Sequence, residues 1–104
     1  MEVHLAPGQP ARLTDVDDLR RFSVIMAGSQ EGLASLAEAL HGIVAFEGSE
    51  HAWVSVDWLV ETSGRSGSAE WRDQFAAMVA YARSKGWMRT DPEAIRGHVV
   101  RQAG

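Results

Sequence analysis

The sequence contains no cysteine. This absence excludes a disulfide framework, thiolate zinc sites and a cysteine nucleophile. The sequence also lacks an apolar run of the roughly 18 to 20 residues that cross a bilayer, and its first residues show no basic region followed by an apolar stretch. We therefore expect a soluble, cytoplasmic protein that makes no use of a membrane.

Positive charge is also scarce, because ten Lys and Arg residues stand against 14 Asp and Glu residues, for a net charge of −4. A protein that grips phosphate backbones carries the opposite sign, so we expect no nucleic-acid partner. The charge is uneven: residues 1–64 carry −7 and residues 65–104 carry +3. Such halves either neutralise each other within one fold or pair between two copies, and we predict a homodimer.

The length of 104 residues, with 45% hydrophobic and 23% charged residues, is typical of one globular domain. We therefore expect a single α+β domain over residues 1–104. Residues 1–19 are expected to form a loop or short helix leading into the core. The run Pro7-Gly8-Gln9-Pro10 favours a loop, a short strand fits residues 3–5, and Thr14 with the acids after it can begin a short helix.

The next part of the chain alternates apolar and polar residues from Arg21 to Met26, which predicts a strand. From Ser29 to Leu40 the apolar residues recur at helical spacing, and Gly42 follows. This pattern predicts a helix with a glycine at its end.

Two short β-prone runs, 43–47 and 50–54, flank Gly48-Ser49. A two-residue connection of this kind predicts a β-hairpin with a tight turn. The resulting register places Phe46 opposite His51.

The C-terminal half contains one clear helix and two ambiguous segments. Residues 55–61 fit a short helix capped by Ser55 and a strand equally well. The residues between Ser68 and Gly86 predict a helix with an apolar stripe. Residues 92–101 begin like a helix but are β-branched thereafter, so we predict a turn and then a strand.

The resulting order of strand, helix, hairpin, helix and strand predicts a ferredoxin-like (βαββαβ) two-layer sandwich, with an antiparallel sheet and the helices on one face. This architecture does not specify a function, because many unrelated activities share it.

Sequence motifs give little chemistry. No glycine-rich phosphate loop, nucleophile elbow or closely spaced pair of histidines is present, so we expect no metal and no cofactor. The candidates for acid-base catalysis are His51, Asp57 and His98, since an aspartate beside a histidine can orient its ring.

The four tryptophans are many for so short a chain. Trp71 begins a helical stripe and Trp87 follows a glycine, so both are expected in the core. Trp53 and Trp58 flank Asp57 closely in sequence, and these three residues are the candidates for ligand binding.

Two functions are consistent with these features. The first is a small non-catalytic interaction or ligand-binding module that associates with itself and takes a small apolar ligand or a protein partner. The alternative is a small cofactor-independent enzyme that acts on an apolar or aromatic molecule, in a pocket lined by Trp58, Asp57 and His51.

Overall fold

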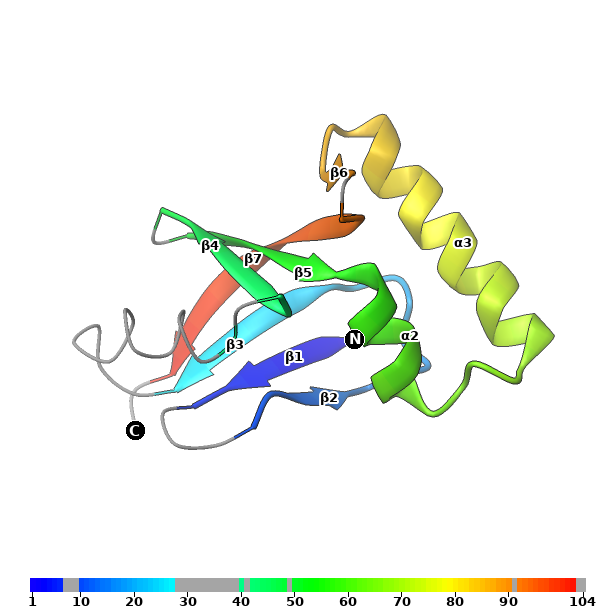
Figure 1. Ribbon diagram of the computed structural model, residues 1–104, viewed down its shortest axis with the longest axis horizontal. Helices are drawn as coiled ribbons and strands as arrows, with labels where there is room; N and C mark the ends of the chain where they lie inside the picture. The colour runs from blue at the N-terminus through cyan, green and yellow to red at the C-terminus, as the bar shows by residue number, and fades with distance from the viewer. Residues whose placement is uncertain (7–9, 28–39, 41, 49, 91, 103–104) are drawn as a thin grey trace.

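The computed structural model describes residues 1–6, 10–27, 40, 42–48, 50–90 and 92–102 (Figure 1). The helix expected from Ser29 onward lies outside these residues. The elements along the chain are β1 (Glu2–Leu5), β2 (Arg12–Thr14), β3 (Ser23–Ala27), β4 (Val44–Glu47), β5 (His51–Ser55), α2 (Val56–Ser63), α3 (Ala69–Ser84), β6 (Met88–Arg89) and β7 (Ala94–Gln102).

The strands form one mixed sheet in the order β2-β1-β3-β7-β5-β4, with β6 paired to the start of β7. Strands β1, β3 and β7 are parallel to one another, and the other pairs are antiparallel. Helices and strands are therefore combined, but the predicted ferredoxin-like antiparallel sandwich is wrong. The chain departs from it because β1 extends the sheet beside β3, and because β7 lies between β3 and the hairpin.

The N-terminal segment forms β1, where a short strand was expected at residues 3–5, and β2, where a loop or short helix was expected. Val3 and Leu5 alternate with more exposed neighbours and are buried, so β1 has one core-facing side. Thr14 belongs to β2 and does not cap a helix. Asp15 follows with a φ of 51°, a left-handed conformation that aspartate tolerates and that interrupts helix formation.

The predicted hairpin is present, but its register differs by one residue. Glu47 pairs with His51, which leaves three residues, 48 to 50, between the strands. Phe46 therefore pairs with the buried Ala52, and both side chains lie on the core side. A shift of one residue turns every side chain to the other face, so His51 points away from the core.

Both described helices begin with a serine cap. The Ser55 hydroxyl accepts a hydrogen bond from the Trp58 N–H at 3.2 Å, and the helix is therefore the correct interpretation of residues 55–61. The Ser68 hydroxyl accepts from the Trp71 N–H at the start of α3, also at 3.2 Å. Neither helix is long and apolar enough to cross a membrane.

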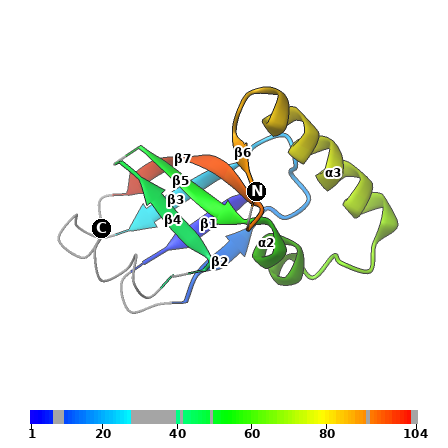
Figure 2. The same cartoon turned by 45° about the horizontal axis from the view of Figure 1, so that its top comes forward.

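The core lies between one side of the sheet and the two described helices. Helix α2 contacts β2 and β5, whereas α3 contacts β6 and the start of β7, beside the end of the sheet. Figures 1 and 2 show α3 in this peripheral position from two directions. Its buried residues Trp71, Phe75, Val79 and Ala82 join the core from that side.

Candidate functional site

A groove of about 1550 Å³ opens where α3, the segment 15–22 and the edge of β7 approach one another. Its position depends on strand pairing. Strand β6 pairs with β7 at Ala94 and Ile95, and β3 pairs with it from His98 onward. Because β5 occupies the opposite edge, Gly97 faces no paired strand on this side, whereas the Arg96 N–H donates to the carbonyl of Trp87 at 2.8 Å. The groove opens at this gap in the sheet.

The floor of the groove depends on Gly97. A Cβ atom there would lie 2.8 Å from Cε2 of Phe22 and 3.3 Å from Cγ2 of Val24. The missing side chain therefore lets the Phe22 ring pack against the backbone of β7.

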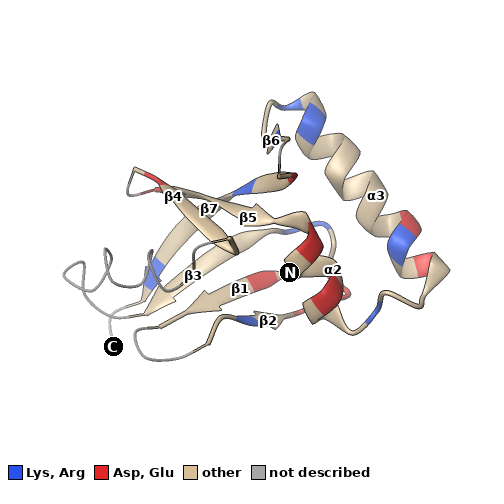
Figure 3. Cartoon of the chain, in the orientation of Figure 1, with Lys and Arg blue, Asp and Glu red and all other residues tan. Residues whose placement is uncertain are grey.

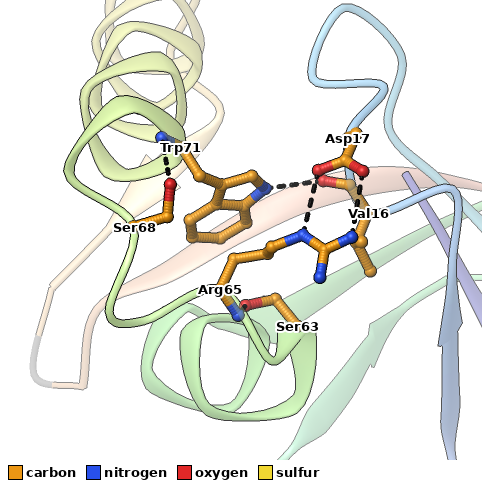
Figure 4. A network of polar contacts seen from close by, with 6 residues as sticks. All are labelled: Val16, Asp17, Ser63, Arg65, Ser68 and Trp71. Atoms are coloured by element: carbon orange, nitrogen blue, oxygen red, sulfur yellow. Dashed lines mark hydrogen bonds and ion pairs between the residues drawn. The ribbon is translucent and has the colours of Figure 1, made fainter.

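One wall of the groove, the segment 15–22, is held by two long-range contacts (Figure 4). The Trp71 indole Nε1 donates a 2.7 Å hydrogen bond to the Val16 carbonyl. The Arg65 guanidinium donates two bonds to the Asp17 carboxylate, at 3.2 and 3.1 Å. These bonds hold the pKa of Asp17 below its usual value. The backbone N–H of Arg65 in turn donates a hydrogen bond to the hydroxyl of Ser63.

The other wall is the middle of α3, which carries no charged residue from position 74 to position 82. Figure 3 shows this uncharged stretch between charges near the two ends of the helix. Ala77, Met78 and Tyr81 line the groove from this stretch, and the Tyr81 side chain is 59% exposed. An exposed helix face without charge is unusual, because surface helices normally present polar residues to water.

Trp87 stands at the rim of this wall. Its N–H donates to the Ala82 carbonyl at 2.9 Å, and the Gly86 N–H donates to the Arg83 carbonyl at 3.2 Å. These two bonds form a Schellman ending, which places the Trp87 ring edge-on against Tyr81 with ring centroids 6.0 Å apart. Trp87 was expected in the core, and this expectation is wrong, since Trp87 is 40% exposed.

Arg96, His51 and His98 form a polar cluster at the sheet side of the groove. An Arg96 Nη2 atom lies 3.1 Å from Nδ1 of His51. Arginine has only donors, so Nδ1 accepts and the neutral ring carries its proton on Nε2. The His98 ring lies edge-on to His51, with centroids 5.7 Å apart. The Nε atom of Arg96 is buried and has no hydrogen-bond partner.

The predicted catalytic candidates are only partly brought together. His51 and His98 are paired across β5 and β7 and both line the groove. Asp57 is exposed in the first turn of α2 and is not among the groove residues that the structure describes. The Asp57 carboxylate therefore does not lie beside the imidazole of His51 or of His98.

The predicted ligand-binding tryptophans lie elsewhere. Trp58 is half-buried on α2 and packs against the core. Trp53 lies on the sheet face that points away from the core, where its indole donates to Glu47 and the Arg89 guanidinium lies 5.0 Å from its ring centroid. Within the described residues, neither side chain lines the groove.

Sequence reasoning missed Arg96, Tyr81 and Trp87 as site residues. The absence of charge between positions 74 and 82 was a usable signal, because a helix face that is half exposed seldom lacks charge. No comparable local signal marks Arg96, whose surroundings depend on strand pairing.

Within the described parts of the chain, no three His, Cys, Asp or Glu side chains gather closely enough to hold a metal ion. Comparisons with protein-family models, with curated proteins and with solved structures find no match. The basis for a function is therefore the chemistry of the groove itself.

Proposed function

We propose that this protein is a non-catalytic interaction module whose groove receives a segment of a partner polypeptide. The observation that carries the proposal is the exposed Tyr81–Trp87 pair beside the uncharged stretch of α3. Contiguous exposed apolar surface of this kind marks an interaction surface or a binding groove.

The size of the groove favours a polypeptide over a small molecule. Small-molecule pockets span about 300 to 1,000 Å³, whereas this groove measures about 1550 Å³. A partner segment with several side chains makes better use of such a space than one compact ligand does.

The residue types in the groove agree with this choice. Protein interfaces are enriched in Tyr, Trp, Phe, Met and Arg, and binding energy concentrates at Trp, Tyr and Arg. The groove combines these types in Phe22, Met78, Tyr81, Trp87 and Arg96.

The wall formed by the segment 15–22 is also held in place before a partner binds. The bonds of Trp71 to Val16 and of Arg65 to Asp17 hold the segment 15–22 against the start of α3. A fixed wall lowers the conformational entropy lost on binding. The Arg65–Asp17 pair also joins the acidic and the basic half within one chain. The opposite charges of the two halves therefore do not by themselves require a dimer, and self-association stays a prediction.

Selection from a displayed library of random peptides tests the proposal. Peptides enriched on the native chain should bind Trp87→Ala at least about tenfold more weakly, which corresponds to about 1.4 kcal/mol. The matched control is Val100→Ala, which alters an apolar residue outside the groove that is 40% exposed, as Trp87 is, and should leave affinity within about twofold, a change of about 0.4 kcal/mol.

Peptides that bind Trp87→Ala as tightly as the native chain would overturn the proposal. Light scattering over a range of protein concentrations tests whether a second copy of the chain occupies the groove instead. A dimer that dissociates in Trp87→Ala would show that a second copy, and not a different partner, fills the groove.

A further inference from the structure

We infer that the partner segment presents a carboxylate to the polar cluster of Arg96, His51 and His98, next to an apolar side chain that packs on Tyr81 and Trp87. This inference rests on the proposed function and specifies the chemistry of the partner. Its basis is a cation that lines the groove and has no ion-pair partner among the described residues.

Arg96 is the cation in question. None of the ion pairs among the described residues involves it, and its contact with His51 brings no negative charge. Its buried Nε has no partner, and a half-buried guanidinium without a counter-charge is held at a cost in free energy. A carboxylate that reaches the Nη atoms from the groove would offset this cost through charge-assisted hydrogen bonds.

The two histidines add donors of the matching kind. Because Nδ1 of His51 accepts from Arg96, the Nε2–H of that ring is left to donate. His98 is exposed beside it, on the same face of the sheet. The cluster thus offers several N–H groups to one acceptor, as a carboxylate requires.

The surrounding charges favour a single negative charge over two. With His51 neutral, the cluster contains the one fixed positive charge of Arg96. The carboxylate of Glu47, which lies across the strand pair from His51, is bonded to the indole of Trp53. A carboxylate matches one positive charge, whereas a phosphate dianion would leave one negative charge unbalanced.

The wall formed by the segment 15–22 is nearly balanced in charge, which also favours a partner group with a single negative charge. It carries Asp15, Asp17 and Asp18 together with Arg20 and Arg21, and Asp17 is already paired with an arginine outside the groove. This wall provides no strong positive field for a more highly charged anion.

Three capped dipeptides serve as probes, and each contains a phenylalanine. In the first, the second residue is glutamate and the C-terminus is amidated; in the second, glutamine replaces the glutamate. The third has the glutamine but a free C-terminal carboxylate. The pair of acids distinguishes a side-chain carboxylate from a chain terminus, and the neutral probe isolates the apolar contact.

Proton–nitrogen NMR spectra of the full chain report binding at the Arg96 Nε–H and at the Trp87 indole N–H. At least one acidic probe should shift both signals and bind about tenfold more tightly than the neutral probe, a difference of about 1.4 kcal/mol. The neutral probe should shift only the Trp87 signal.

Arg96→Gln should remove the preference for the acidic probes and leave the neutral probe unchanged. The matched control is Arg101→Gln, on the same strand but outside the groove, which should retain the preference. If Arg96→Gln does not fold, Arg96→Lys tests the same point, since it keeps the charge but loses the planar fork and should weaken the preference.

Equal binding of acidic and neutral probes would overturn the inference. If no probe shifts either signal while library peptides still depend on Trp87, the inference is wrong and the proposed function stands. If the library peptides do not depend on Trp87 either, both are wrong.

Discussion

A tryptophan lies near each end of α3, and the two differ in burial. Trp71, near the start of the helix, contacts the segment 15–22, and Trp87, just after its end, stands at the rim of the groove. Trp71 is 4% exposed, stacks on Phe75 with ring centroids 5.0 Å apart, and uses its indole N–H to hold the Val16 carbonyl. Trp87 is 40% exposed and touches Tyr81 with one edge. The first tryptophan stabilises the fold, and the second is available to a partner.

The difference arises from the path that the chain takes after each tryptophan. At the start of α3 the chain continues as a helix, so Trp71 stays on the buried side with Phe75 and Val79. At the end of α3 the left-handed Gly86 turns the chain toward β6. The ring of Trp87 is thereby left at the rim of the groove. Helical periodicity governs the first position, and turn geometry governs the second.

The largest expected effect comes from Trp71→Ala. Emptying this site should lower the free energy of unfolding by about 3 to 5 kcal/mol, since it creates a cavity and leaves the Val16 carbonyl without its donor. Trp87→Ala should change it by less than about 1 kcal/mol, as exposed substitutions usually do. Urea denaturation measures the free energy of unfolding of both variants, and equal losses in the two would contradict the expected difference.

A smaller effect is expected from Gly97→Ala at the groove end of the molecule. The added methyl group would lie 2.8 Å from the Phe22 ring, and overpacking of this kind costs about 1 to 3 kcal/mol. Gly67→Ala is the control, because nothing lies within 4 Å of a Cβ at that position. The double variant with Phe22→Leu should recover part of the loss; a loss that is unaffected by the Phe22 substitution would rule out the steric cause.

The smallest effect is expected from Arg65→Ala, which removes the exposed ion pair at the Trp71 end. The pKa of Asp17 should rise toward its ordinary value, because the Arg65 hydrogen bonds that lower it are lost. A lowered carboxyl pKa stabilises the folded state above the unfolded value, about 3.9, and this stabilisation disappears as the pH falls through the folded pKa.

The native chain should therefore be slightly more stable than Arg65→Ala near neutral pH, and the difference should vanish in strong acid. An NMR titration of the Asp17 carboxyl and urea midpoints at the two pH extremes measure this. Arg72→Ala, an exposed arginine in the first turns of α3, is the control. An unchanged Asp17 titration in Arg65→Ala would show that the pair does not form in solution.

Local signals in the sequence predicted several elements well. Alternation identified β3, serine caps and glycine ends identified α3, and β-branched residues identified β7. The strands β2 and β6, with three and two residues, are too short to show a period. The parallel pairing of β1 with β3 depends on tertiary contacts, which local propensity does not encode.

The site was less predictable than the fold. His51 and His98 were selected for their chemistry, and the pairing of β5 with β7 brings them together across 47 positions of sequence. Asp57 was grouped with them because an aspartate beside a histidine can orient its ring, but the chain enters α2 before it reaches Asp57. For Trp87 a core position was expected, but Trp87 and its contact Tyr81 are both exposed, so their contact is not part of the core.

The central position of β7 has a consequence for folding kinetics. Among the described strands, β7 alone joins the group β2-β1-β3 to the hairpin β5-β4. Each group can form early from contacts within itself, but the complete sheet requires residues 98–102 of β7 to meet β3, 75 positions earlier. Loop closure over such a distance slows folding relative to helical proteins of similar size. A nascent chain that has not yet released β7 therefore presents two unjoined sheet edges to its surroundings.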